Sequence, residues 1–376
     1  MTAASVRNQY FDELFSTPGL LWMGQNTNHI PAHPDVKAAM LASVEAAEFN
    51  AYAPPLGFEA LRRGIVEDLG VAGVEAVVTE GGVNALASIC RARCRPGTTL
   101  VTTDPTWKWP CLFARQQGAE VVEIPIYDPA TGYKLTPAAL DAAVDERTAV
   151  IYIVDPNNPL GICYTREEIE AFSAIARRAG ALLVHDCTYR DFATGHWPAL
   201  HASTENTVVS MSFSKWLGLA GLRVGAFVAA PALAAEIAGW ATGVLGGSVI
   251  AQRAAMAGLA VKPAWMEEVR RINRANQAAV KAAAEAQGFV LPIYPSQGNF
   301  LVVETIGAGI RPEALVAAAK RRGIMIRQGT YHTERFGDRF VKVSTSVPTA
   351  WVDTFCAALP AIVAEARTLN DVEAQF

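Results

Sequence analysis

The sequence is poor in charge and has no concentration of positive charge. Asp, Glu, Lys and Arg make up 18% of the 376 residues, and the formal net charge is -4. No tract rich in Lys and Arg occurs along the chain. Because proteins bind nucleic acids chiefly through clustered cations, we expect no nucleic-acid partner.

Cysteine is scarce as well. The chain has six cysteines, and the pair Cys90 and Cys94 has no second pair that would complete a zinc site. The other four are Cys111, Cys163, Cys187 and Cys356. We therefore expect no metal site, and we expect buried, reduced thiols in a cytoplasmic protein.

Long apolar runs are also absent. No run reaches the length that spans a membrane. The first residues, Met1 to Asp12, lack the apolar core of a signal peptide and carry an acid too early for a transit peptide. These features favour a cytoplasmic protein that does not bind membranes.

What the chain does have is length and apolar content, with 51% hydrophobic residues. This length exceeds one ordinary core, so we expect a large α/β domain with a smaller partner domain. From residue 77 to residue 225, apolar strand-like runs alternate with helical ones, which is typical of a parallel sheet. The expected strands are 77–79, 99–101, 121–124, 149–154, 181–184 and 207–209, and the clearest expected helix is 166–178.

The pattern changes at about residue 250. An Ala-rich helical stretch runs to Ala286 and is followed by strand candidates at 289–291, 300–303 and 340–343. The predicted fold is α/β, with a large domain built on a mostly parallel sheet flanked by helices and a smaller α+β domain. The expected division is an N-terminal arm joining the small domain (1–45), the large domain (46–265) and the small C-terminal domain (266–376).

The most informative segment is 212–225, Ser-Phe-Ser-Lys-Trp-Leu-Gly-Leu-Ala-Gly-Leu-Arg-Val-Gly. Lys215 and Arg223 lie in a stretch that is otherwise almost free of charge. Apolar surroundings disfavour the charged form of a lysine and leave an amine nucleophile. We interpret Lys215 as the residue that joins the aldehyde of pyridoxal 5'-phosphate, and Arg223, Ser212 and Ser214 as ligands of its phosphate. A solvated lysine before a glycine turn is the alternative.

Polar residues after two other strands suit the same cofactor. Asp186 comes just after the strand 181–184 and could keep the pyridine nitrogen protonated. Tyr189, three residues further on, could bond the ring oxygen. Asn158, after the strand 149–154, would donate to the same oxygen. His185 points to the opposite face of its strand, so we interpret it as structural. For Asp186 a helix cap or a structural pair is the alternative.

A glycine turn lies between the first strand and the following helix. Its Gly82 and Val83 would present backbone N–H groups and a helix N-terminus to the phosphate. Trp107, after the next strand, could lie flat on the cofactor ring, although it could equally belong to the core.

These segments, in this order, resemble the class I/II aminotransferase family of fold type I pyridoxal-phosphate enzymes over about residues 20–350. The resemblance implies an amino acid substrate and a homodimer in which Tyr52 reaches the phosphate of the neighbouring subunit. The implied positions are the covalent lysine (Lys215), phosphate arginine (Arg223), pyridinium aspartate (Asp186), ring-oxygen tyrosine and asparagine (Tyr189, Asn158) and stacking aromatic (Trp107).

The chain departs from the family near its C-terminus. The family carries an arginine in an Arg-apolar-Ser strand that clamps the substrate carboxylate, and here the strand has Lys342 at that position. A lysine is a point charge and not a fork. Either Lys342 binds the carboxylate alone, or Arg339 or Arg327 supplies the clamp, or the substrate is held differently. A lysine exposed on the surface of its strand is the alternative.

A second departure is the segment 22–31, Trp-Met-Gly-Gln-Asn-Thr-Asn-His-Ile-Pro. It is similar to a subgroup of arginine oxidases and hydroxylases from antibiotic pathways, in which oxygen accepts the electrons. That resemblance implies that His29 carries protons, that Gly24 lies beside the substrate and that Glu13 pairs with a guanidinium. A loop histidine next to a proline is the alternative.

Three functions follow from these residues. The first is an aminotransferase-like enzyme that acts on the α-amino group of an amino acid, and the second is an oxygen-using, deaminating arginine oxidase. The third is a noncatalytic regulatory domain. A domain that only borrows the fold would not need Lys215, Asp186 and Tyr189 together.

Overall fold

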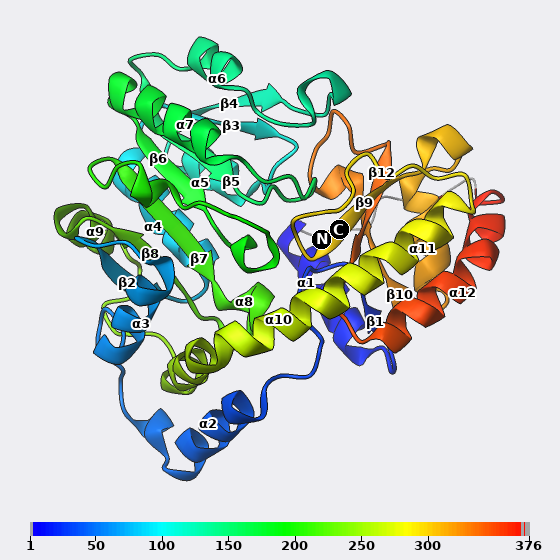
Figure 1. The fold of residues 1–376 in the computed structure, drawn as a ribbon, viewed down its shortest axis with the longest axis horizontal. Coiled ribbons are helices and arrows are strands. Elements are labelled where there is room, and N and C mark those ends of the chain that lie inside the picture. The colour runs from blue at the N-terminus through cyan, green and yellow to red at the C-terminus, as the bar shows by residue number, and fades with distance from the viewer. Residues whose placement is uncertain (1–2, 370–371, 373–376) are drawn as a thin grey trace.

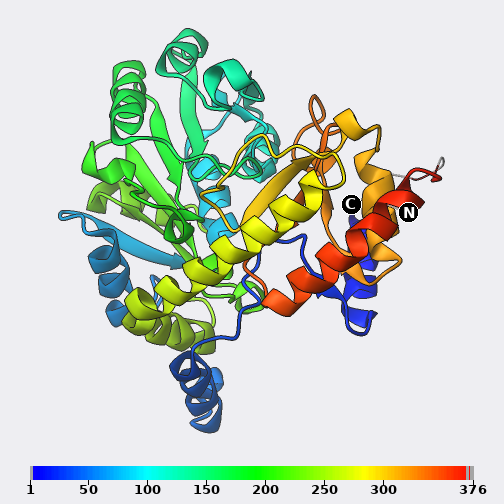
Figure 2. The same ribbon diagram turned by 45° about the vertical axis from the view of Figure 1, so that its right-hand side comes forward.

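The computed structural model describes residues 3–369 and residue 372. Its two parts are a large domain around one sheet and a smaller domain on which the N-terminal segment lies (Figures 1 and 2). The helices are α1 (Ala3–Ser16), α2 (Pro34–Glu45), α3 (Glu59–Leu69), α4 (Gly82–Arg93), α5 (Trp109–Gln116), α6 (Pro137–Ala143), α7 (Arg166–Ala179), α8 (Phe213–Trp216), α9 (Pro231–Ala238), α10 (Val249–Glu285), α11 (Pro312–Lys320) and α12 (Thr349–Ala366).

The large sheet has seven strands in the order β2-β8-β7-β6-β5-β3-β4. Only β8 runs antiparallel to its neighbours, so the mostly parallel sheet expected from the sequence is confirmed. Its strands are β2 (Glu75–Thr79), β3 (Thr99–Asp104), β4 (Glu120–Pro125), β5 (Thr148–Val154), β6 (Leu182–Asp186), β7 (Thr207–Ser212) and β8 (Gly225–Ala229).

Both faces of this sheet are buried, which explains why its strands are apolar without strict alternation. Val77 packs into the core that includes α4 and α9, whereas its neighbour Val78 packs into the core that includes α3 and α10. Tyr152 and Ile153 of β5 likewise face different cores, and Ile153 packs with residues of α7. Polar side chains are therefore pushed to the strand ends.

The smaller domain contains a three-stranded antiparallel sheet in the order β11-β12-β9, beside a short parallel pair, β1-β10. The strands are β1 (Leu21–Trp22), β9 (Phe300–Glu304), β10 (Ile324–Met325), β11 (Arg327–Gln328) and β12 (Phe340–Ser344). The strand expected at 289–291 is wrong, because only Val290 forms an isolated bridge, to Glu304. One bridge between Pro- and Gly-rich neighbours does not extend into a ladder.

The Ala-rich stretch is confirmed as one helix, α10, of 37 residues. It packs on α2 at one end and on α12 further along, so it joins the two domains (Figure 2). The expected boundary at residue 265 falls inside this helix, and the domain limits stay a prediction.

One helix, α12, is long and apolar enough to span a membrane when judged by length and composition alone. Its sequence includes Asp353 and Glu365, so it is not an uninterrupted apolar run. Val352, Phe355, Leu359 and Ile362 of this helix are buried in the core of the smaller domain. Packing against α10 and α11 accounts for its apolar face.

Candidate active site

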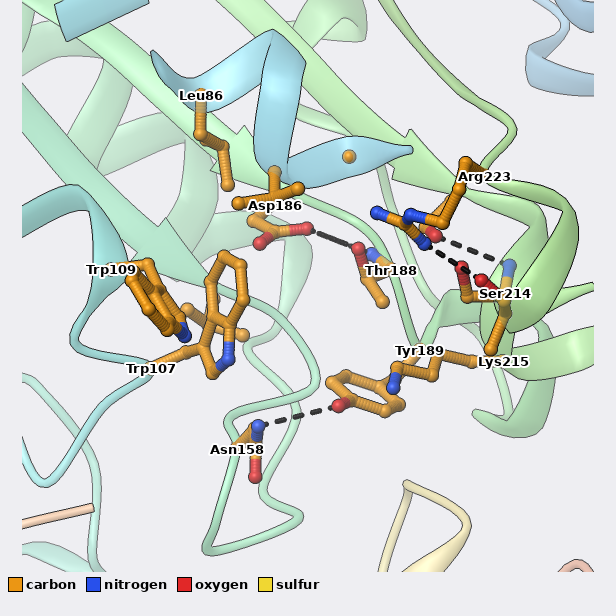
Figure 3. A pocket seen from close by; sticks show the side chains of 15 residues that line it. Leu86, Trp107, Trp109, Asn158, Asp186, Thr188, Tyr189, Ser214, Lys215 and Arg223 are labelled. Carbon is orange, nitrogen blue, oxygen red and sulfur yellow. Dashed lines mark hydrogen bonds between the residues drawn. The ribbon is translucent and has the colours of Figure 1, made fainter. Parts of the chain in front are cut away.

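A cavity of about 320 Å³ opens where several strands of the large sheet end. Val154, Asp186 and Ser212 are the last residues of β5, β6 and β7, and all three line it. Open parallel sheets place their ligands at such carboxyl ends. Most of the predicted site residues line this cavity: Gly82, Val83, Trp107, Asn158, Asp186, Tyr189, Ser212, Ser214, Lys215 and Arg223 (Figure 3).

Lys215 projects into the cavity from the short helix α8. Its Nζ donates a hydrogen bond to the backbone oxygen of Gln25, at 3.0 Å. Burial, followed by the charge of Arg223, lowers the pKa of Lys215 from 10.5 to about 8, against the opposing charge of Asp186. With this pKa, roughly a tenth of the lysine is a neutral amine at pH 7, far more than of an ordinary lysine.

We expect the cofactor-free protein to react with pyridoxal 5'-phosphate through Lys215 at a rate that rises with pH and levels off above about pH 8. Only the unprotonated amine attacks an aldehyde, and an unperturbed lysine would level off above pH 10. Stopped-flow absorbance measures the rate, and Lys215→Arg is the control that removes the nucleophile. A rate that still climbs beyond pH 10 would contradict the lowered pKa.

Asp186 is buried and held by three hydrogen bonds. Its Oδ1 accepts from Thr188 Oγ1 at 2.6 Å and from Thr188 N at 3.1 Å, and its Oδ2 accepts from Tyr152 OH at 3.0 Å. Burial raises the pKa of Asp186, and the hydrogen bonds from Thr188 and Tyr152 oppose this rise only in part. The carboxylate is thus fixed in one orientation beside the cavity (Figure 3).

The sequence reasoning missed Thr188, Tyr152 and Trp109. Thr188 had a local signal, because a residue two positions after an aspartate at a strand end readily bonds its carboxylate. Tyr152 had none, since the contact depends on the pairing of β5 with β6. Trp109 lines the cavity near Trp107, and the guanidinium of Arg7 from α1 lies 5.0 Å from the centre of its ring.

His185 faces away from the cavity, as expected. Its Nε2 bonds Asp155 Oδ2 at 3.2 Å, and its Nδ1 accepts from Ala199 N at 3.0 Å. His196 Nε2 also lies 3.2 Å from Asp155 Oδ2. This buried cluster supports the loop that carries Asn158.

At the opposite end of the cavity, Gly81 and Gly82 begin helix α4 beside Arg223. Gly81 has φ of +81°, and a Cβ there would lie 2.5 Å from Arg223 Nη2. The Arg223 guanidinium donates to the backbone oxygens of Ala220 and Glu80. A helix start without a capping side chain, together with a guanidinium, forms an anion-binding end.

Lys342 does not line the cavity directly but reaches it through Asn158. Its Nζ donates to Asn158 Oδ1 at 3.3 Å, and Asn158 Nδ2 donates to Tyr189 OH at 3.3 Å. Burial and the charges of Arg327 and Lys215 lower the pKa of Lys342 well below its ordinary value. Arg327 is its register partner across β11 and β12.

Arg339, by contrast, forms an ion pair with Glu304 at 2.7 Å and is half exposed. Arg339 is therefore held by Glu304 and does not line the cavity.

Four further predicted residues do not line the cavity. Gly24 packs against the backbone of Ile326, and Glu13 pairs with Lys320 at 2.8 Å rather than facing the cavity. Tyr52 is 82% exposed. Their roles remain predictions.

His29 is the fourth of these residues. Its Nε2 lies 2.7 Å from Thr27 Oγ1, and its ring centre lies 5.2 Å from that of Trp351. Burial lowers the pKa of His29. A neutral imidazole in the segment that bonds Lys215 through Gln25 is compatible with proton transfer. The His29 ring, however, packs against Trp351.

The sequence of residues 18–359 matches the family described as aminotransferase class I and II. The chain belongs to the class I and II aminotransferases. It is 31% identical over 315 residues to a histidinol-phosphate aminotransferase of Geobacillus sp. (strain WCH70), with 82% of each chain covered. It is 29% identical over 360 residues to an aromatic amino acid aminotransferase of Rhodococcus jostii (strain RHA1), covering 94% of this chain and 93% of that one.

Solved aminotransferase structures share the fold. The N-succinyldiaminopimelate aminotransferase of Mycobacterium tuberculosis superposes with a TM-score of 0.85 at 22% identity, covering 96% of this chain and all (100%) of that chain. An aspartate aminotransferase of Thermus thermophilus with maleate gives 0.83 at 20% identity, with 96% of each chain covered. This class I and II aminotransferase is thus a pyridoxal-phosphate-dependent enzyme that acts on an amino acid, and not a noncatalytic domain.

Proposed function

We propose that this aminotransferase binds pyridoxal 5'-phosphate in the cavity and transfers the α-amino group of an amino acid to a keto acid. The observation that carries the proposal is the placement of Lys215, with a pKa of about 8, in one cavity with Asp186 and Arg223. The three side chains are an amine, a carboxylate and a guanidinium, and each is held at the end of a helix or strand.

The residues present fit this cofactor. The anion-binding end at Gly81, Gly82 and Arg223 would hold the phosphate, since a side chain at Gly81 would occupy the space of the guanidinium. Asp186 would pair with the pyridine nitrogen, and Tyr189 with Asn158 would bond the ring oxygen. When bound, pyridoxal 5'-phosphate withdraws electrons from the substrate α-carbon.

The protein's own residues then account for the proton transfer. Lys215 Nζ is the base that takes the proton from the substrate α-carbon, and it can return that proton because its pKa lies near working pH. The bond from Nζ to Gln25 O orients the amine in the free protein. The hydrogen bonds from Thr188 and Tyr152 fix Asp186 and favour its anionic form, which would pair with the protonated pyridine nitrogen.

For the substrate carboxylate we propose Arg327 together with Lys342. The two face the same side of a sheet as register partners, and burial, followed by the charges of Arg327 and Lys215, lowers the pKa of Lys342. A bound carboxylate would relieve that repulsion. Arg327 would supply the fork that Lys342 lacks.

The decisive experiment supplies amino donors with and without a keto acid. Aromatic amino acids, histidinol phosphate and aspartate are the first donors to test, because similar proteins are named for them. Turnover that requires 2-oxoglutarate or pyruvate supports transamination. Turnover in air without a keto acid, with oxygen uptake and ammonia release, would refute it.

The second candidate is an oxygen-using arginine oxidase. It is favoured by the placement of segment 24–29, which bonds Lys215 through Gln25 and carries the partly buried His29. L-arginine under air, followed with an oxygen electrode, tests it directly. His29→Ala should abolish oxygen uptake if this candidate is right and should leave keto-acid-dependent turnover within about tenfold if it is wrong.

We also propose that the enzyme is a homodimer that works in the cytoplasm. Large apolar side chains are exposed near the phosphate end, at Tyr52 (82%), Val244 (84%), Phe49 (58%) and Trp240 (52%). An isolated bridge from Ala53 to Gly246 ties the two segments together. Exposed apolar residues gathered in this way mark interaction surfaces.

Replacing Val244 by Glu should convert the dimer to a monomer and weaken cofactor binding, because a charge would be buried in the interface. Light scattering after size exclusion measures the mass. Val290→Glu is the matched control, since Val290 is also exposed (54%) but lies in the smaller domain. A wild-type monomer, or a Val244→Glu protein that remains dimeric, would contradict this interface.

A further inference from the structure

Asn26 lies where three parts of the chain meet. It is 1% exposed and has φ of 56°, in the left-handed region. Its backbone N donates to Ser344 Oγ at 2.8 Å, and its backbone oxygen accepts from Asn299 Nδ2 at 2.8 Å. Its side chain reaches Tyr189 in the large domain. The N-terminal segment, the smaller domain and the cavity are thus joined at one residue.

The hydrogen-bond directions around Asn26 follow from donor chemistry. Lys342 Nζ donates to Asn158 Oδ1, so the other amide atom, Asn158 Nδ2, faces Tyr189. Asn26 lies 3.4 Å from the same Oδ1, so it must present its Nδ2 there. Ser344 Oγ accepts from Asn26 N and can therefore donate its own proton to Asn26 Oδ1, at 3.2 Å.

The phenol oxygen of Tyr189 consequently accepts from two amides, Asn26 Nδ2 at 3.1 Å and Asn158 Nδ2 at 3.3 Å. Both acceptor positions of a phenol are then filled, so its O–H points elsewhere. Tyr189 lines the cavity, which leaves that proton for a group bound there. Donors to its oxygen also make a phenol a stronger donor.

We propose that Asn26 is a positioning residue whose side-chain amide aims and polarises the Tyr189 hydroxyl for the ring oxygen of the bound cofactor. This rests on the proposed function. The chromophore is the bound cofactor, whose visible absorbance changes when it gains or loses a proton. Its ring oxygen is more negative in the unprotonated form, so a stronger hydrogen-bond donor stabilises that form. Loss of the Asn26 amide should therefore raise the apparent pKa of the bound chromophore.

Other charges near Tyr189 act on the same titration and stay in place when Asn26 is changed. Burial is the largest effect on the pKa of the Tyr189 phenol and raises it, and the bond from Asn26 lowers it. The charges of Asp186 and Tyr331 raise it further. Lys342 reaches the phenol through Asn158, and Lys215 lines the same cavity. A shift seen on removing Asn26 thus reports its own hydrogen bond.

The experiment titrates the visible absorbance of purified holoenzyme between pH 5 and about 10. Asn26→Gly removes the amide and tolerates the positive φ. We expect its apparent pKa to rise by roughly half a unit to one unit, the size of one hydrogen bond. Asn273→Ala is the matched control, because Asn273 is fully buried but bonds Gly298 and Thr345 instead. It should lose stability without shifting the titration.

A double-mutant cycle separates positioning from general loosening. In a Tyr189→Phe background, Asn26→Gly should cause no further shift, since the hydroxyl is already absent. Ser344→Ala removes the bond that anchors the Asn26 amide and the acceptor of Asn26 N but keeps the amide itself. It should give a smaller shift in the same direction and serves if Asn26→Gly does not fold.

The outcomes keep the two proposals apart. A wild-type protein that shows no cofactor absorbance refutes the proposed function and the Asn26 role with it. A wild type that titrates normally, with Asn26→Gly titrating at the same pH, refutes the Asn26 role alone. An equal shift in the Tyr189→Phe background also overturns it.

Discussion

Replacement of Lys215 by alanine reduces turnover by at least about 10³-fold and abolishes covalent attachment of pyridoxal 5'-phosphate. In the proposed function the side chain supplies both the amine that joins the cofactor and the base that takes the α-proton. Its pKa of about 8 suits both roles, whereas an ordinary lysine would be almost wholly protonated. Steady-state rates with the best amino donor, together with absorbance of the purified variant, measure the effect.

Lys281→Ala is the matched control for that experiment. Lys281 lies on α10 and pairs with Glu285 at 2.6 Å at the surface, away from the cavity. Its loss should leave turnover unchanged, because exposed pairs contribute little. Retention of more than about a tenth of the activity in Lys215→Ala would contradict the role of this lysine.

Replacement of Asp186 by asparagine lowers kcat by at least about 10²-fold, the usual cost of removing one preorganised electrostatic partner. Asparagine keeps the shape and can still accept from Thr188, so the change removes chiefly the buried charge. Rapid-quench or steady-state kinetics with saturating cofactor give kcat. A near-ultraviolet spectrum like that of the wild type shows that the cavity is intact.

Tyr152→Phe tests the hydrogen bond that positions Asp186 separately from the charge of Asp186. It removes the 3.0 Å bond to Oδ2 but leaves the carboxylate and its two bonds from Thr188. One hydrogen bond corresponds to roughly a tenfold effect or less on kcat. If Asp186→Asn loses less activity than Tyr152→Phe, the carboxylate is not the essential group.

Which residues line this cavity could be predicted because parallel strands end at one edge. Asp186 and Ser212 end two neighbouring strands and Asn158 follows a third, so their nearness required only the order of the elements. The same logic placed Gly82 at a helix start beside Arg223. Local patterns therefore fixed which residues line the cavity without any knowledge of their distances.

Residues that approach the site from other parts of the fold were harder to predict. Asn26 bonds Tyr189, 163 residues away, and nothing in the neighbourhood of either residue signals that contact. Glu13 was expected at the substrate, yet a cation on α11, Lys320, lies closer to it. The expected strand at 289–291 failed because strand formation depends on a partner, and Val290 bonds only Glu304.

Lys342 shows a different limit. Its position in an apolar strand suggested either an exposed lysine or a carboxylate ligand, and burial decides between them. It is 3% exposed and bonds Asn158, so a solvated surface lysine is wrong. The sequence could not reveal that its register partner is Arg327, because register depends on the pairing of β11 with β12.

The most direct test of the account is to locate the covalent attachment. Holoenzyme treated with borohydride and digested should yield one peptide that carries the reduced pyridoxyl phosphate, with the mass placed on Lys215. The same treatment of Lys215→Ala should yield none. Attachment at Lys342 or another lysine, or a wild-type protein that takes up no cofactor, would contradict the central claim.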